Sequence, residues 1–91
     1  MGKNYNLPSK VKFSKSQRKN KKYMVEFEIN GKPYKIHFGS DMYEQYKDRT
    51  PLKLYSAFDH GDKERRARYF MRHGTTTDPT TAKFWSNNYL W

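Results

Sequence analysis

The sequence predicts a small α+β domain, in which an antiparallel hairpin over residues 23–38 packs against two or three short helices. Two alternating runs of apolar and polar residues flank Asn30-Gly31, and this dipeptide is the strongest short-range signal of a tight hairpin turn. Two later segments have the capping residues and apolar spacing of helices. The chain has 91 residues, which is enough for one small domain.

The hairpin has one predicted register. A two-residue turn at Asn30-Gly31 places Ile29 opposite Lys32. The other facing pairs are then Phe27 with Tyr34, Val25 with Ile36, and Tyr23 with Phe38. Facing residues point to the same side of a sheet, so these pairs make one apolar face. A slip of one residue would turn that face to water.

Charge is unevenly distributed, which predicts a basic arm over residues 1–22 and a single domain over 23–91. The arm has eight Lys and Arg and no acid, a charge of +8, whereas the rest has 11 basic and nine acidic residues, a charge of +2. Residues 10–14 alternate and could add a third strand beside the hairpin. Residues 14–22 are polar and basic, as in a loop.

Three helices are considered after the hairpin. Ser40 or Asp41 could cap a short one over 42–47, with Met42, Tyr43 and Tyr46 on its apolar side, and Thr50-Pro51 would end it. Residues 52–58 could be an extended piece or a helical turn.

The second helix, Lys63–His73, has Asp62 as its N-cap and Gly74 after its end. Ala67, Phe70 and Met71 form its predicted core stripe. A second stripe on this helix consists of Arg65, Arg68, Tyr69 and Arg72.

The last helix is predicted to begin at Asp78-Pro79, with Asp as N-cap and Pro in the first helical position. Ala82, Trp85 and Tyr89 share one face of it. We expect the aromatic face of the hairpin to meet Phe70, Met71 and Trp85. An aromatic chain end is expected to dock into the core or onto a partner, and the candidate docking residues are Trp85, Tyr89, Leu90 and Trp91.

The basic arm is the first candidate binding site, because clustered Lys and Arg neutralise phosphates in a salt-sensitive, sequence-independent way. The alternatives are a solvated tail and a segment seated among anionic protein neighbours. The candidate residues are Lys3, Lys10, Lys12, Lys15, Arg18, Lys19, Lys21 and Lys22. The rings of Tyr5, Phe13 and Tyr23 lie between these charges and could stack on bases or belong to the core.

The arginines of the second helix are the other candidates. Arg65, Arg68 and Arg72, with Arg66, could clamp phosphates or carboxylates in a bidentate manner. Alternatively, they form a solvated face that pairs locally with Asp62 and Glu64.

No pattern indicates catalysis, a metal or another cofactor. His37, His60 and His73 lack the close spacing of metal ligands, and no catalytic triad order or nucleotide-binding glycine loop is present. We therefore expect a protein that is not an enzyme and takes no small-molecule substrate. No apolar run approaches the roughly 20 residues of a membrane span, so no membrane partner is expected.

Several motifs of rare residues occur in one order. They are Ile36-His37-Phe38-Gly39, Tyr43 and Tyr46, Arg65-Arg66 with Tyr69 and Arg72-His73, Thr81-Ala82, Phe84-Trp85-Ser86, and Leu90-Trp91. This pattern resembles a small family of uncharacterised basic proteins from large DNA viruses of algae and amoebae, over about residues 23–91. Lys83, where that family often has glycine, and an apparent insertion over 50–58 depart from it. The resemblance implies a viral protein that could be carried in the particle, and it transfers no catalytic residue.

Together these observations predict a non-enzymatic, virion-associated structural protein whose basic arm contacts DNA or an anionic inner surface. One alternative is a minor capsid or cement protein that binds only capsid neighbours. The other is a soluble nucleic-acid-binding regulatory protein. The expected locations are the virion and, during infection, the host cytoplasm or nucleus.

Overall fold

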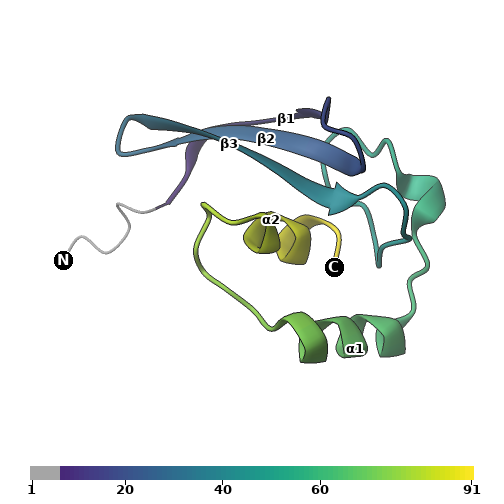
Figure 1. Cartoon of the computed structure of the whole chain (residues 1–91). Helices are drawn as coiled ribbons and strands as arrows, with labels where there is room; N and C mark the ends of the chain where they lie inside the picture. The colour runs from purple at the N-terminus through teal and green to yellow at the C-terminus, as the bar shows by residue number, and fades with distance from the viewer. Residues whose placement is uncertain (1–6) are drawn as a thin grey trace.

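The computed structural model describes residues 7–91, which form a three-stranded antiparallel sheet in the order β1-β2-β3 and two α-helices. The elements are β1 (Ser9–Lys15), β2 (Lys21–Ile29), β3 (Lys32–Ser40), the 3₁₀ turn η2 (Ser56–Phe58), α1 (Lys63–His73) and α2 (Ala82–Tyr89). Figure 1 shows the sheet as one layer, with α2 beneath it and α1 beyond α2. The predicted α+β fold is therefore confirmed, including the third strand.

The β2–β3 hairpin has the predicted register. Asn30 and Gly31 have φ angles of 53° and 79°, in the left-handed region that a type I′ turn requires at both central positions. The facing pairs are Ile29 with Lys32, Phe27 with Tyr34, Val25 with Ile36, and Tyr23 with Phe38. Local turn chemistry and alternation are sufficient to set this register.

Strand β1 comes from within the segment predicted as a basic arm. It pairs antiparallel with β2, and Phe13 lies opposite Val25. The register shifts between Ser9 and Lys12, and within this bulge Lys10 has a φ of 54°. Residues 9–15 are thus part of the sheet, and the predicted boundary between residues 22 and 23 falls inside β2.

The core lies between the sheet and α2. Its buried side chains are Tyr23, Val25, Phe27, Phe38, Trp85 and Leu90. The Trp85 ring centroid lies 5.0 Å from that of Phe27 and 5.9 Å from that of Phe13. Its indole N–H donates to the Pro79 carbonyl at 2.7 Å, so the polar edge of this buried ring has a partner. The expected contact between the hairpin and Trp85 is confirmed.

Helix α2 begins three residues later than predicted. Its N-cap is Thr81, whose hydroxyl accepts from the Phe84 N–H at 3.3 Å. Asp78 instead caps the preceding turn, where its carboxylate accepts from the N–H and the hydroxyl of Thr80 at 2.9 and 2.6 Å. The Asp78 carboxylate therefore stabilises the turn that precedes α2.

The helix predicted over residues 42–47 is absent, and this prediction is wrong. The N–H of Gln45 donates to the Phe58 carbonyl at 3.2 Å, and that of Lys47 donates to the Leu90 carbonyl at 3.1 Å. Because these main-chain groups pair with other parts of the chain, they do not form the i to i−4 bonds of a helix. Met42 and Tyr43, placed on its apolar side, are 68% and 69% exposed. Residues 52–58 are turns followed by η2.

A buried polar network joins this loop to β2. The Asp48 carboxylate accepts from the Tyr23 hydroxyl at 2.5 Å and from the Thr50 hydroxyl at 2.7 Å. The buried Gln45 side chain accepts from the Lys22 ammonium at 2.5 Å and donates to the Asp59 carboxylate at 2.6 Å. This network fixes the loop, because each of these buried side chains has a hydrogen-bond partner.

Helix α1 has the predicted bounds and caps. The Asp62 carboxylate accepts from the N–H groups of Glu64 and Arg65 at 2.9 and 3.2 Å, and the chain leaves the helix at Gly74 with a φ of 69°. Negative charge at this end also opposes the helix dipole. The sequence therefore determines where α1 starts and stops.

The orientation of α1 is the reverse of the prediction. Ala67 and Met71 are exposed, Phe70 is half-buried, and no residue of α1 is buried. The predicted core stripe thus faces outward, and the expected contact of Phe70 and Met71 with the hairpin is wrong. The other stripe, with the arginines and Tyr69, lines a groove against the body.

Candidate nucleic-acid interface

A groove of about 650 Å³ separates α1 from the sheet and α2. We call it the basic groove, because six Lys and Arg line it, with only one acid among the described residues that do so. The cations are Lys21, Lys22, Arg65, Arg68, Arg72 and Lys83, with His73 beside them, and the acid is Glu44. Three elements distant in sequence therefore contribute basic residues to the lining of one hollow.

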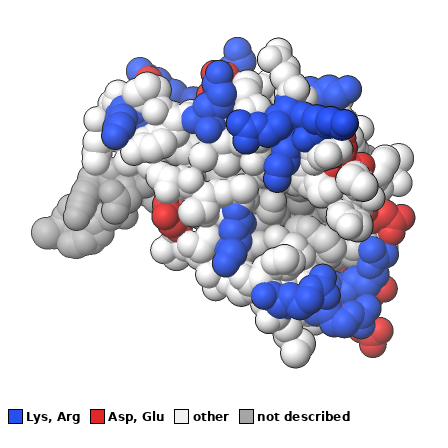
Figure 2. Space-filling model, viewed as in Figure 1, with Lys and Arg blue, Asp and Glu red and all other residues white. Residues whose placement is uncertain are grey.

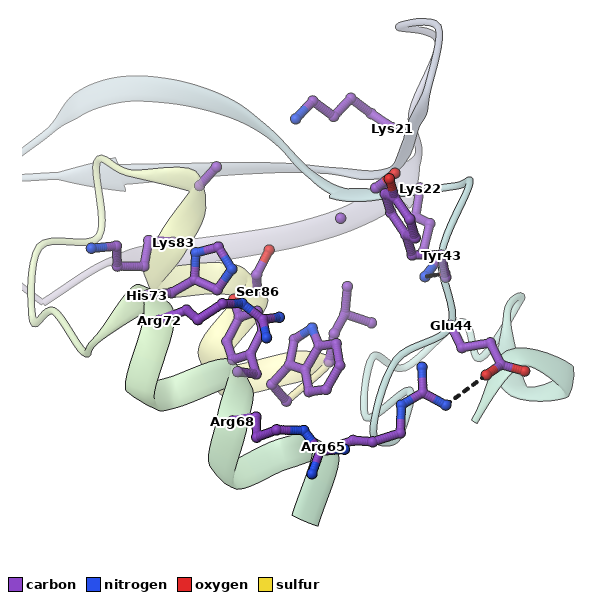
Figure 3. A pocket seen from close by; sticks show the side chains of 16 residues that line it. Lys21, Lys22, Tyr43, Glu44, Arg65, Arg68, Arg72, His73, Lys83 and Ser86 are labelled. Carbon is purple, nitrogen blue, oxygen red and sulfur yellow. Dashed lines mark hydrogen bonds and ion pairs between the residues drawn. The ribbon is translucent and has the colours of Figure 1, made fainter. Parts of the chain in front are cut away.

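The α1 arginines project from one side of their helix (Figure 3). Arg65 pairs with Glu44 at 2.9 Å. Arg68 and Arg72 have no carboxylate within 4.0 Å anywhere in residues 7–91. Both residues line the groove and are exposed, so their charge is available to an anion. The predicted local pairing with Asp62 and Glu64 is therefore not found among the described residues, because the Arg65 partner is Glu44 in the loop.

One wall of the groove is aromatic. The rings of Tyr69 and Trp91 stack with centroids 4.2 Å apart and an angle of 5° between their planes. Arg66 lies outside the groove lining and anchors this wall, since its Nε donates to the Trp91 carbonyl at 2.6 Å and its guanidinium lies 5.1 Å from the Tyr46 ring centroid. These contacts attach α1 to the body in place of a buried apolar stripe.

Lys22 has a different role from the other groove cations. Its side chain is 1% exposed, and the ammonium donates to the Tyr43 carbonyl at 2.7 Å and to Gln45. Burial lowers the pKa of Lys22 to about 8, and the nearby Asp48 carboxylate opposes this shift. The Lys22 charge therefore holds the loop against β2 instead of facing solvent.

The remaining predicted anion-binding residues lie on and after β1. Lys10, Lys12, Lys15, Arg18 and Lys19 are exposed, and Lys21 is half-buried at the groove. Only Lys10 among these has an ion pair within the described residues, a 3.5 Å contact to Glu28. Lys3 lies outside the described residues, as does the candidate stacking residue Tyr5. Figure 2 shows basic side chains gathered over the sheet and over α1 on one face.

The predicted docking residues are used mostly within the chain. Trp85 and Leu90 are each 1% exposed in the core, so neither offers a surface to a partner. Tyr89 is half-buried and stacks on Trp85 at 5.7 Å, and Trp91 stacks on Tyr69. Of the two interpretations of this chain end, docking into the core is the one observed. Phe13 and Tyr23 are likewise core rings.

Sequence reasoning missed several groove residues. Tyr43, His73, Lys83 and Ser86 line the groove, but none belongs to a charge run. His73 could have been found, because it lies one helical turn beyond Tyr69 on the arginine side of α1. Tyr43 and Ser86 depend on long-range contacts that no local pattern reveals.

Two of the three histidines have lowered pKa values. Burial and the nearby Arg18 lower the pKa of His37, and burial and Arg65 lower that of His60. Residues 7–91 contain no group of three or more His, Asp or Glu side chains arranged to hold a metal ion.

Residues 7–91 also contain no helix that is long and apolar enough to cross a membrane.

These features define a class: a small α+β protein with an arginine-lined groove between its helices and sheet. Residues 11–73 match DUF5754, a family of unknown function, and the chain belongs to this family. The match spans most of β1, the hairpin, the loop and α1, and so includes the groove arginines. No curated protein and no solved structure matches the chain.

Proposed function

We propose that this protein is a non-enzymatic nucleic-acid-binding protein that uses the basic groove and the lysines of β1 to contact phosphates. The observation that carries the proposal is the orientation of α1. An amphipathic helix ordinarily turns its apolar stripe inward, whereas α1 turns Arg68 and Arg72 toward the hollow and leaves Met71 83% exposed. Charge placed there at the expense of apolar burial favours an anionic ligand.

The charge distribution supports a polyanion in particular. The chain has a net charge of +10, and the exposed lysines of β1 extend the basic surface beyond the groove (Figure 2). Contacts to phosphates release counterions, so affinity for nucleic acid should fall steeply with salt. Arginine is suited to this task because its planar fork binds phosphate through two hydrogen bonds.

The cellular setting rests on the resemblance to proteins of large DNA viruses. It supports a structural role inside the particle, where the basic surface would contact DNA or an anionic inner surface. A cement protein that binds only capsid neighbours would show no DNA binding at low or high salt. A soluble regulatory protein would bind DNA but be missing from purified particles when their proteins are identified by mass spectrometry.

Substitutions test the proposal better than truncation, because removing the residues before Tyr23 deletes β1 and part of β2. We expect Arg68→Gln with Arg72→Gln to weaken DNA binding and to reduce the slope of log affinity against log salt by about 2, one for each phosphate that is no longer neutralised. Fluorescence anisotropy with a labelled oligonucleotide at several salt concentrations measures both quantities.

Two further double variants serve as comparisons. Lys32→Gln with Lys35→Gln removes the same charge at exposed positions near the hairpin turn, outside the groove, and is expected to change binding much less. Lys12→Gln with Lys15→Gln tests the β1 surface. Equal losses of affinity in the groove and hairpin variants would show that net charge alone acts, and no DNA binding by the unaltered protein would refute the proposal.

A further inference from the structure

The shape of the basic groove bears on which form of nucleic acid enters it. Its volume of about 650 Å³ lies within the range of about 300–1,000 Å³ typical of pockets for single small ligands. Proteins that read a duplex ordinarily insert a helix or strand into a DNA groove. A duplex cannot enter a hollow of this size, whereas one or two unpaired nucleotides can.

The lining has the two components that bind single strands. Such sites combine a positive groove along the phosphates with aromatic side chains on which bases stack. Arg68 and Arg72 supply positive charge from α1, and Lys21 supplies it from the sheet side. Figure 3 shows Tyr43 beside Lys22, across the groove from the α1 arginines.

Tyr43 is the aromatic residue free to stack. Its side chain is 69% exposed, and within residues 7–91 its ring pairs with no other aromatic ring, unlike Tyr69 and Trp91. The Tyr43 main-chain carbonyl accepts from the Lys22 ammonium at 2.7 Å, and the part of the chain that the structure describes gives the Tyr43 hydroxyl no hydrogen-bond partner. An exposed tyrosine ring at the rim of a cationic groove gains little for folding but offers a surface to a base.

We propose that the basic groove binds unpaired nucleotides of a single strand, with phosphates on Arg68 and Arg72 and a base stacked on Tyr43. This rests on the proposed nucleic-acid-binding function and specifies its substrate. Stacking depends on the π face that every base has, so the site is tolerant of sequence. Phosphate contacts fix the strand without reading bases.

The test compares a labelled oligothymidine with a duplex of equal length, titrated by fluorescence anisotropy. We expect tighter binding of the single strand. Tyr43→Ala should weaken single-strand binding about 5- to 150-fold, the range that stacking of one base supplies, and leave duplex binding unchanged. Tyr43→Phe keeps the ring and should retain affinity.

Met42→Ala is the matched control, because Met42 is the neighbouring residue, is 68% exposed, and does not line the groove. Equal binding of single strand and duplex, both unaffected by Tyr43→Ala, would overturn the inference and leave the proposed function standing. Displacement of the strand by an equal concentration of a nucleoside triphosphate would also overturn it, in favour of a free nucleotide. Binding of neither nucleic acid would refute the proposed function itself.

Discussion

Helices α1 and α2 are both short, and each has an N-cap side chain that accepts a hydrogen bond from the main chain. They differ in how they are held. Helix α2 is attached by a buried Trp85 and the adjacent Leu90, whereas α1 has no buried residue and is attached by the Tyr69–Trp91 stack and by Arg66. Apolar burial holds α2, whereas ring stacking and guanidinium contacts near the surface hold α1.

This difference teaches that helix formation and helix orientation have separate causes. Caps and spacing specify the bounds of α1 from local sequence, and for α2 they indicate a helix but place its start three residues too early. Which face of a helix turns inward depends on the surface that it packs against. At α1 this surface is the ring of Trp91 and a groove, and not an apolar face. The weakly packed helix is thus the one that presents charge to a ligand.

The largest expected effect is the loss of stability when the buried anchor of α2 is removed. Trp85→Ala should lower the free energy of unfolding by about 3–5 kcal/mol, the cost typical of deleting a buried Trp or Phe side chain. A small domain has only about 5–15 kcal/mol in total, so a large share of its stability would be lost. Urea denaturation followed by circular dichroism measures this, and a decrease below about 1 kcal/mol would contradict the burial of Trp85.

The next effect concerns the buried network beside the sheet. Asp48→Ala leaves the Tyr23 hydroxyl and the Thr50 hydroxyl without their acceptor, which should cost about 2–3 kcal/mol. Burial raises the pKa of Asp48, but the hydrogen bonds from Tyr23 and Thr50 outweigh it and hold the pKa below its usual 3.8. Because the folded pKa is the lower one, this stabilisation is complete above the unfolded pKa and is lost as pH falls through the folded pKa.

The unaltered protein should therefore lose stability as pH falls below about 4. Urea midpoints measured at several pH values test this, and Asp48→Ala should flatten the profile. Asp62 and Asp78, whose pKa values are also lowered by hydrogen bonds, will leave a residual slope. An unchanged profile in the Asp48 variant would exclude this carboxylate as the source.

The smallest expected effect is the loss of stability when the ring stack that attaches α1 is removed. Tyr69→Ala removes the stack on Trp91 and should cost about 1 kcal/mol, as is typical of aromatic pairs. Hydrogen exchange should then quicken in α1 and not in α2, because only α1 depends on this contact. Met71→Ala, on the exposed face of the same helix, should change stability by less than about 0.5 kcal/mol. Equal effects of the two substitutions would contradict the observed orientation of α1.

These regions also separate what the sequence could predict from what it could not. The register of the hairpin follows from Asn30-Gly31 and alternation, which act within a few residues. The bounds of α1 follow from Asp62 and Gly74 in the same way. The predicted helix at 42–47 failed because Gln45 pairs with Phe58, a long-range interaction that outweighs local propensity.

The candidate site was predicted only in part. Arg65, Arg68 and Arg72 were identified from their spacing, and the structure brings them together with Lys21. The alternation of β2 gave no sign that Lys22 is enclosed, because the loop over residues 43–58 covers it from far along the chain. A groove built from three separate elements has no signature in any one of them.

The bulge in β1 affects whether copies of the chain can pair edge to edge. A flat outer strand is a template on which a second copy can add its own strand, and repetition of that step gives fibrils. The edge strand β1 has an irregular register around Lys10 and carries exposed ammonium groups at Lys12 and Lys15, so two β1 edges repel each other. Copies concentrated side by side on one polymer would therefore not join through their β1 edges.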